Sequence, residues 1–290
     1  MKEQLLGCLV GGGIGDAIGG FYENRAATGV DLLAHAWHTS DDTQLTLATC
    51  QAMVEAGGKV VPAAIARTFL EWYNAGRLTG LGASTLKALR DLQVGAHWAL
   101  AGRTGERAAG NGAAMRIAPL AFKVDLTWER HLVRDVVNIT HKNDEAYAGA
   151  LAVVVAVQQA LGKHWTAEND LLPLVIDHLP DTRVRDRLIE LQGLEGQSVL
   201  EVGKQYGSSG YVVESVPLAL YAAGQITNQP VAELFAALVE VGGDTDTVCS
   251  MTGQIIGTRF GPNVFPAAWR AKFGRTPDMA RVEAIVRQWQ

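Results

Sequence analysis

Several kinds of residue are scarce in this 290-residue sequence, and each scarcity excludes a class of protein. Only three cysteines occur, Cys8, Cys50 and Cys249, and their spacing fits no zinc motif, so we expect buried free thiols in a reducing cytoplasm. The apolar stretch before Cys8 is too short for a signal peptide, which needs roughly 7–15 apolar residues. No run of about 18 uncharged apolar residues occurs, so no membrane span is expected.

Positive charge is also in short supply. Lys and Arg number 25 against 30 Asp and Glu, which gives a net charge of -5. Phosphate backbones are bound by clustered Lys and Arg, so this balance argues against a nucleic-acid partner. Hydrophobic residues nevertheless make up 48 % of the chain, enough for a sizeable core, and this excludes global disorder.

Strand-like alternation is nearly absent, whereas helical patterns recur along the chain. With only nine prolines, and no Ser/Pro linker or repeat, nothing divides the sequence. The sequence therefore predicts one all-α domain over residues 1–290, with roughly a dozen helices. Besides a first helix, the segments with helical period or capping signals are 61–76, 128–137, 144–161, 183–192, a helix capped by Ser198 and Glu201, Pro230 to Gly242, Thr245 to Phe260, and Pro277 to about Trp289.

Glycine, by contrast, is plentiful, with 32 residues. Gly7, Gly11, Gly15 and Gly19 recur at every fourth position, which places them on one face of a helix. A face without side chains lets a neighbouring backbone approach closely, so we expect this helix at the centre of a crowded bundle. The segment is a poor dinucleotide-binding fingerprint, since Asp16 stands where the third glycine should be and no βαβ unit surrounds it.

Two pairs of aspartates stand out, each where a loop enters a helix: Asp41 with Asp42, and Asp244 with Asp246. One aspartate in each pair could cap its helix and complement the helix dipole, an effect worth roughly 0.3–1 kcal/mol. Capping does not account for neighbouring like charges, which repel each other unless a cation neutralises them. Carboxylates with nearby hydroxyls, and no interleaved Cys or His, form the oxygen donor set that Mg²⁺ or Mn²⁺ prefers. The spacing predicts a two-ion site that bridges these distant loops.

Histidines and a lone acid near these pairs have simpler explanations. His35 and His38 lie three residues apart, but no third His or Cys completes a zinc site, so we favour surface or supporting roles for them. Glu23 would be a solvated surface acid unless the fold brings it to the metals.

Two loops of small residues could bind a nucleotide. Residues 110–116 begin an apolar helix whose free N–H groups could cradle phosphate, although a tight turn between helices is an equally simple reading. Residues 208–211 form a second loop, in which Tyr211 could stack on a base.

Together these segments resemble the ADP-ribosylglycohydrolases, a family that includes the dinitrogenase reductase activating glycohydrolases. The resemblance covers almost the whole chain and consists of six segments in the family's order: Gly15–Gly19 with Glu23, Ser40–Thr43, Gly110–Arg116, Thr140–His141, Ser209–Ser215 and Gly243–Thr247. It implies a single compact all-α domain with a binuclear metal cleft for two Mg²⁺ or Mn²⁺ ions. The implied activity is metal-dependent hydrolysis of the glycosidic bond between ADP-ribose and a protein side chain or small acceptor.

The resemblance also implies a role for individual residues. The metal ligands would be Ser40, Asp41, Asp42, Asp244, Asp246 and Thr247. A carboxylate of Glu23, Asp41 or Asp42 would deprotonate the attacking water. The family more often has Thr where Ser40 stands, and either hydroxyl can serve. The substrate-binding residues would be Gly110, Asn111, Gly112, Ala113, Met115 and Arg116 at the pyrophosphate and adjoining ribose, His141 at the ligand cleft, and Gly210 with Tyr211 at the adenine.

One departure from the family pattern leaves the linkage open. Ala108 stands where some arginine-directed relatives have an acidic residue, so ADP-ribosyl serine, O-acetyl-ADP-ribose and other adducts remain candidates beside arginine. We expect a cytoplasmic monomer that acts on an ADP-ribosylated protein or a small ADP-ribosyl adduct. A member that binds ADP-ribose without turnover is the alternative, although the retained metal positions argue against it. An isoprenoid diphosphate synthase is disfavoured, because its Asp-Asp-x-x-Asp motif would need a third acid where Leu45 follows Asp41 and Asp42.

Overall fold

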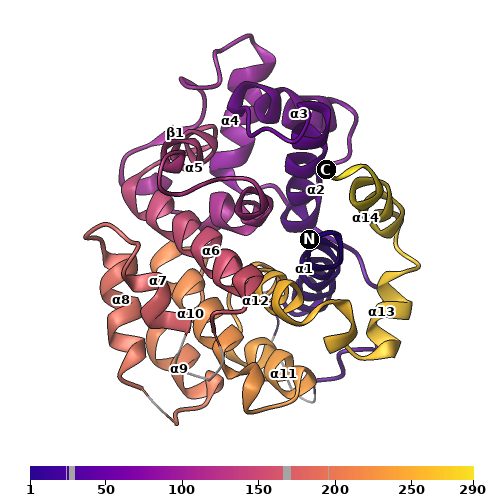
Figure 1. Ribbon diagram of the computed structural model, residues 1–290, viewed down its shortest axis with the longest axis vertical. Coiled ribbons are helices and arrows are strands. Elements are labelled where there is room, and N and C mark those ends of the chain that lie inside the picture. The colour runs from indigo at the N-terminus through magenta and orange to yellow at the C-terminus, as the bar shows by residue number, and fades with distance from the viewer. Residues whose placement is uncertain (24, 26–29, 166–170, 195) are drawn as a thin grey trace.

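The computed structural model describes residues 1–23, 25, 30–165, 171–194 and 196–290. Helices of many lengths pack around a central pair, and the only strands in these ranges are β1 (Arg103–Thr104) and β2 (His141–Lys142), which pair in parallel (Figure 1). The α-helices are α1 (Lys2–Tyr22), α2 (Asp41–Glu55), α3 (Pro62–Asn74), α4 (Ala83–Gln93), α5 (Arg130–Asn138), α6 (Asp144–Gly162), α7 (Leu171–Ile176), α8 (Arg183–Gln192), α9 (Val199–Tyr206), α10 (Val212–Gly224), α11 (Val231–Val241), α12 (Thr245–Phe260), α13 (Ala267–Phe273) and α14 (Pro277–Gln288).

The predicted all-α architecture is confirmed, and so are most of the predicted helix positions. The capping box of α9 forms as its sequence indicates, with the Ser198 hydroxyl accepting from the backbone of Glu201. The segment after Gly110 is the exception, because it forms the 3₁₀ turns η2 (Asn111–Arg116) and η3 (Ala118–Phe122) instead of an apolar α-helix. Pro119 explains the difference, since proline has no N–H and its ring clashes with the carbonyl four residues earlier in an α-helix.

Helices α1 and α12 lie side by side and antiparallel at the centre of the molecule (Figure 1). A Cβ built on Gly11 would lie 2.1 Å from the carbonyl oxygen of Gly253, and one built on Gly7 would lie 2.0 Å from that of Gly257. The predicted glycine face therefore meets backbone directly. Its partner face on α12 has the same four-residue spacing of small side chains, which the sequence analysis did not single out: Thr245, Cys249, Gly253 and Gly257.

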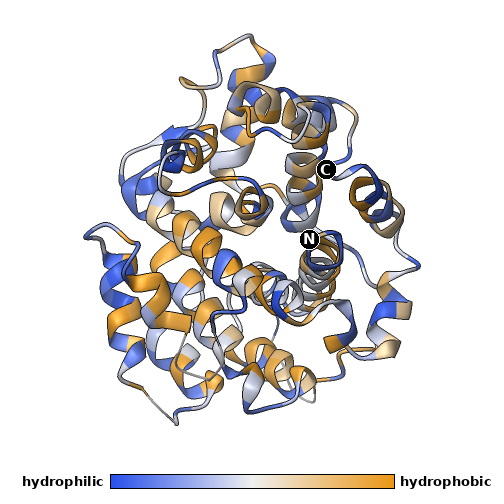
Figure 2. Cartoon of the chain, in the orientation of Figure 1, coloured by the Kyte–Doolittle hydropathy of each residue, from blue (hydrophilic) through white to orange (hydrophobic). Residues whose placement is uncertain are grey.

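In the described part of the chain, two helices are long and apolar enough to cross a membrane, judged by length and composition alone: α1 and α6. Most of each is covered by the rest of the protein, with 83 % of the most apolar window of α1 and 72 % of that of α6 buried. Helices at the core of a folded domain have this character, and Figure 2 shows α6 largely in the colours of hydrophobic residues. Burial inside the fold accounts for their apolar composition.

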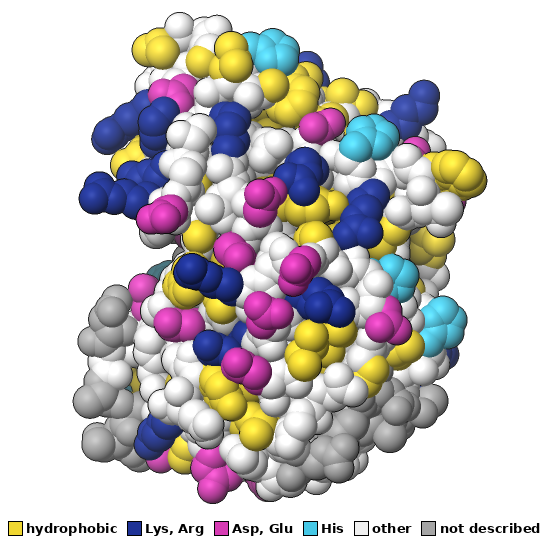
Figure 3. Space-filling view, turned by 90° about the vertical axis from the view of Figure 1, so that its left-hand side faces the viewer, with side chains coloured by type: hydrophobic (Ala, Val, Ile, Leu, Met, Phe, Trp, Pro, Cys, Tyr) yellow, Lys and Arg dark blue, Asp and Glu magenta, His cyan; other side chains and the backbone are white. Residues whose placement is uncertain are grey.

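Charged side chains of both signs share the surface. On the face shown in Figure 3, Lys and Arg gather toward one upper corner, while acidic and basic side chains alternate over the middle. The net charge of -5 is therefore not spread as one continuous acidic surface on that face.

Candidate functional site

A cavity of about 560 Å³ opens where the C-terminal end of α1 meets the first turns of α2 and α12. The antiparallel packing of α1 on α12 brings residues from the two ends of the sequence to this point. Predicted site residues that line the cavity are Glu23, Ser40, Asp41, Asp42, Gly110, Asn111, Gly112, Met115, His141, Gly210, Asp244, Asp246 and Thr247. Ala113, Arg116 and Tyr211 are not among the lining residues.

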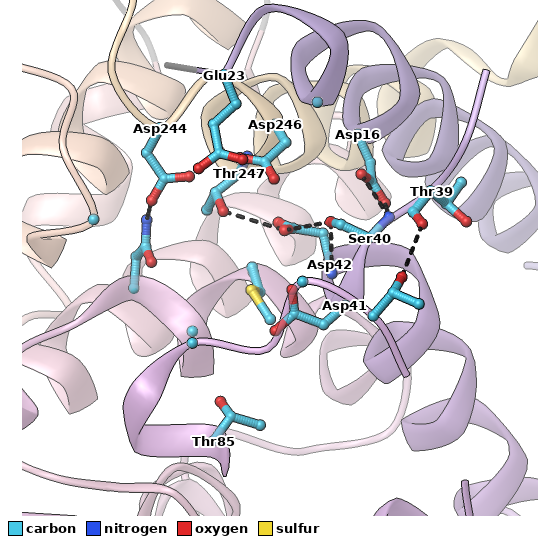
Figure 4. A pocket seen from close by; sticks show the side chains of 18 of the residues that line it. Asp16, Glu23, Thr39, Ser40, Asp41, Asp42, Thr85, Asp244, Asp246 and Thr247 are labelled. Atoms are coloured by element: carbon cyan, nitrogen blue, oxygen red, sulfur yellow. Dashed lines mark hydrogen bonds between the residues drawn. The ribbon is translucent and has the colours of Figure 1, made fainter. Parts of the chain in front are cut away.

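Asp16, on α1, fixes the start of α2. Its carboxylate accepts hydrogen bonds from the backbone N–H groups of Ser40, at 2.9 and 3.0 Å, and of Thr43, at 3.1 Å, and also from the Thr43 hydroxyl. These bonds hold the turn on which Asp41 and Asp42 stand (Figure 4). No role at the site was predicted for Asp16. It is, however, the only charged residue between Glu3 and Glu23 in a glycine-rich apolar segment, a signal that could have suggested one.

Asp42 joins the two halves of the site. Its Oδ2 accepts from the Ser40 hydroxyl at 3.1 Å and from the Thr247 hydroxyl at 3.2 Å (Figure 4). Its other oxygen, Oδ1, is buried and has no hydrogen-bond partner among the residues that the structure describes. A buried carboxylate oxygen without a partner is costly, and a bound cation is one way to satisfy it.

The aspartates of the cavity repel one another in the folded chain. Burial, with Asp16 and Asp244 nearby, raises the pKa of Asp41 to about 8. Burial and the adjacent Asp244 raise the pKa of Asp246 to about 9. Burial, followed by the charge of Asp246, holds the pKa of Asp42 well above its ordinary value. Such a cluster favours either protons or cations, because either would neutralise the like charges.

The donor set of the cavity fits hard divalent cations. Side-chain oxygens of Asp, Ser and Thr surround it, and Mg²⁺ and Mn²⁺ prefer carboxylate and other oxygen ligands. Within the residues that the structure describes, no three side chains of His, Cys, Asp and Glu converge as a ready-made ligand set for one ion. The donor chemistry, the buried like charges and the unpartnered oxygen of Asp42 favour a bound cation here. The side chains are not already arranged around a single ion position in the described residues.

Glu23 lies at the rim of this cavity, just beyond the end of α1. Figure 4 shows its carboxylate pointing toward Asp244 and Asp246, so the fold does bring this acid to the aspartate cluster. The two histidines near α2 have different surroundings. His38 lines the cavity, and His35 stacks on the ring of Phe21.

The two loops of small residues meet at one wall of the cavity. Gly110 and Tyr211 form an isolated antiparallel bridge, and the backbone N–H of Asn111 donates to the carbonyl of Gly210 at 3.1 Å. The side chain of Asn111 donates to Asp244 at 2.9 Å and to the hydroxyl of Ser215 at 3.1 Å. This side chain therefore fixes a predicted metal ligand, and the backbone hydrogen bond fixes the turn against the second loop. The pairing of two loops about 100 residues apart was not visible in the sequence.

Two further residues that the sequence analysis did not select support the entrance to α2. The Thr39 hydroxyl donates to Asp278, a buried residue in the first turn of α14, and Arg281 pairs with the same carboxylate. This contact ties the residue before Ser40 to the C-terminal helix. It depends on where α14 packs, and no local pattern around Thr39 indicates it.

The aspartate cluster predicts a pH dependence in the absence of divalent cations. In EDTA, we expect the unfolding temperature to fall from about pH 7 to about pH 9. The folded pKa values of Asp41 and Asp246, about 8 and about 9, exceed the ordinary carboxyl value, so in this window the folded chain binds more protons than the unfolded chain and stability is lost as pH rises. Below this window the titration of His141 has the opposite effect on stability. Its pKa is lowered to about 3 in the folded chain, so between about pH 3 and its ordinary pKa the unfolded chain binds more protons and stability rises with pH.

Thermal unfolding in EDTA over this window is the measurement. Asp41→Asn should flatten the decline, because it removes one of the buried carboxyl groups whose raised pKa values cause it. An unfolding temperature that rises from pH 7 to pH 9 would contradict a repulsive carboxylate cluster.

Comparison with known proteins identifies the family and the fold. Residues 1–289 match the family model described as ADP-ribosylglycohydrolase. ADP-ribosylarginine hydrolase Tri1 of Pseudomonas putida (strain GB-1) is 27 % identical, over 98 % of this chain and 81 % of its own length. ADP-ribosylhydrolase ARH3 of Homo sapiens is 27 % identical, over 92 % of this chain and 88 % of its own. A solved structure described as an ADP-ribosylglycohydrolase-related protein complex has a TM-score of 0.73 at 23 % identity and covers 100 % of this chain and 99 % of that one.

The all-α fold and the match along nearly the full sequence define a class of hydrolases. This chain belongs to the ADP-ribosylglycohydrolase family.

Proposed function

We propose that this chain hydrolyses the glycosidic bond between ADP-ribose and a protein side chain or small acceptor, with Mg²⁺ or Mn²⁺ bound in the aspartate cavity. The observation that supports the metal most directly is the buried set of like-charged oxygens, with Asp42 Oδ1 unpartnered. The residues that would hold two ions are Ser40, Asp41, Asp42, Asp244, Asp246 and Thr247. The family match and the names of the relatives support the reaction class.

The residues of the cavity would divide the chemistry among them. When bound, Mg²⁺ supplies Lewis-acid polarisation and fixed positive charge near the reacting ribose. A carboxylate of Asp41, Asp42 or Glu23 accepts a proton from the attacking water, whose oxygen forms the new bond to the ribose C1″. The bond from C1″ to the acceptor breaks, and the acceptor leaves with a proton. The transition state resembles an oxocarbenium ion, so positioning of the ribose and water contributes much of the rate.

The turn at residues 110–112 would hold the pyrophosphate. Its backbone lines the cavity beside His141, and the first residues of a helical turn offer N–H groups to anions. The side-chain hydrogen bond from Asn111 to Asp244 fixes this turn beside that aspartate. Binding at the turn would place the distal ribose beside the aspartates.

The linkage that is cleaved is the open part of the proposal. Ala108 is fully buried beside the turn, where some arginine-directed relatives have an acid that could recognise a guanidinium. Tri1 is named for ADP-ribosylarginine, whereas the name of ARH3 specifies no linkage. Arginine, serine and acetyl linkages all remain substrates to be compared.

The test is a hydrolysis assay on arginine-, serine- and acetyl-linked ADP-ribose in Mg²⁺ and in EDTA. We expect release of ADP-ribose from at least one substrate in Mg²⁺ and loss of that activity in EDTA. Activity unchanged by EDTA would refute the metal requirement. Micromolar ADP-ribose binding without turnover of any substrate would instead favour a binding protein.

A further inference from the structure

We propose that Arg116 is a positioning residue, which acts through the Thr140 hydroxyl to hold His141 in the tautomer that presents its Nε2–H to the cavity. The inference rests on the proposed function for the identity of the acceptor, an oxygen of the pyrophosphate or ribose of an ADP-ribosyl ligand. It also gives Arg116 a different role from the one that the family resemblance implied, which was to bind that ligand.

Arg116 is buried and directed away from the cavity. It ends η2 with none of its surface exposed, and its guanidinium lies 5.0 Å from the ring centroid of Phe69. Its Nη2 donates to the Thr140 hydroxyl at 2.7 Å, and its Nη1 donates to the Gly112 carbonyl at 3.5 Å. Among the described residues no carboxylate forms a salt bridge with it. A buried guanidinium with so few partners has its strongest hydrogen bond to Thr140.

The direction of these hydrogen bonds follows from which groups carry a proton to donate. A guanidinium has only donors, so the Thr140 oxygen accepts from Arg116. The same oxygen lies 2.7 Å from His141 Nδ1, and Thr140 is 1 % exposed. Its single proton is satisfied if His141 Nδ1 accepts it. The opposite direction would leave a buried hydroxyl proton without an acceptor at the described residues around it, which costs free energy.

An accepting Nδ1 leaves the ring proton of neutral His141 on Nε2. The ring edge with Nε2 faces the turn of the cavity, because a Cβ built on Gly110 would lie 3.3 Å from Nε2 and one built on Gly112 would lie 3.0 Å from Cε1. The ring also stays uncharged, since burial and the cations of Arg116 and Arg103 lower the pKa of His141 to about 3. His141 therefore serves as a fixed N–H donor beside the turn, with no change of charge over the working pH range.

The first test is the tautomer itself, measured on ligand-free protein by long-range ¹H–¹⁵N correlations of the His141 ring. Wild type and Thr140→Ser, which keeps the hydroxyl, should show a proton on Nε2 and none on Nδ1. Thr140→Val should show a mixture of tautomers, and so should Arg116→Met if it folds. A wild-type ring protonated on Nδ1, or a Thr140→Val ring still protonated only on Nε2, would overturn the proposal.

The second test is calorimetric binding of ADP-ribose in Mg²⁺. Thr140→Val should weaken binding about five- to tenfold, the range expected for one hydrogen bond, and Thr140→Ser should restore it. In a double-mutant cycle with His141→Ala, Thr140→Val should add almost nothing, because its effect passes through the His141 ring. Additive losses would mean that Thr140 acts on the structure generally and would overturn the proposal.

A matched control separates the effect that passes from Arg116 through Thr140 to His141, here called the relay, from the general cost of replacing a buried threonine. Thr49 is fully buried, and its hydroxyl donates to the carbonyl of Leu45 within α2. Thr49→Val should leave the His141 tautomer and the affinity for ADP-ribose unchanged. If wild type binds no ADP-ribose, the proposed function fails, whereas the tautomer measurement still decides the relay on its own.

Discussion

Asp246→Ala is expected to lower turnover of an ADP-ribosylated substrate by more than about a hundredfold while the protein remains folded. Loss of a residue that only supports a metal ligand costs about 10- to 100-fold, so loss of a proposed ligand should exceed that range. Stability should not fall in EDTA, because the substitution removes one of several buried carboxylates that repel each other and whose pKa values are raised. Turnover and thermal unfolding, each in Mg²⁺ and in EDTA, measure both effects.

The control for this variant is an aspartate that also stands in the first turn of a helix but outside the aspartate cavity. Asp186 is exposed and stands in the first turn of α8, as Asp246 stands in the first turn of α12. Asp186→Ala should leave turnover unchanged, so a loss confined to Asp246→Ala cannot come from the helix dipole. We also expect Mg²⁺ to raise the unfolding temperature of wild type and of Asp186→Ala, but much less that of Asp246→Ala. Wild-type turnover in Asp246→Ala would refute its assignment as a ligand.

Gly11→Ala is expected to lower the free energy of unfolding by about 3 kcal/mol or more, the upper end of the usual cost of overpacking a core. The added methyl group would lie 2.1 Å from the carbonyl oxygen of Gly253 and 2.7 Å from the ring of Phe265. The carbonyl belongs to a helix backbone and cannot rotate away, so α1 and α12 would have to separate. Denaturant unfolding monitored by circular dichroism measures the loss.

Gly20→Ala provides the comparison on the same helix. A Cβ built there would lie 3.8 Å from the Cβ of Asp246, an ordinary van der Waals contact. Alanine favours helix over glycine by roughly 0.5–1 kcal/mol, so this variant should be as stable as wild type or slightly more stable. Equal stability of Gly11→Ala and Gly20→Ala would mean that the two central helices do not require the glycine face.

Local patterns predicted the helices well because each depends on nearby residues. The capping box at Ser198 and the proline at the start of α3 are complete within a few positions, and both form in the structure. The turn after Gly110 was predicted to be α-helical because apolar residues continue through it. The effect of Pro119 on the preceding carbonyls was the feature that the prediction did not weigh.

The candidate site was predictable only as far as its chemistry is local. Paired aspartates at helix starts predicted an oxygen-ligand metal site from spacing alone. The structure places these aspartates in one cavity, and the bound ions stay a prediction. The partners of those aspartates come from elsewhere in the fold: Asp16 from α1 and Asp278, by way of Thr39, from α14. For Arg116, sequence indicated a cation near the phosphate turn but gave no direction for the side chain. Direction is set by packing, and here packing turns Arg116 toward Thr140.

The central helix pair also bears on the order in which the chain is made. The Thr245 hydroxyl donates to the carbonyl of Gly19 across a separation of 226 residues. During synthesis α1 is therefore made long before α12. Its glycine face stays uncovered until more than 200 further residues have been added. Contacts of such long sequence separation slow folding, and they keep an apolar helix uncovered meanwhile. The aspartate cavity, built on the ends of this same pair, forms only once the start of α12, with Asp244, Asp246 and Thr247, has been made.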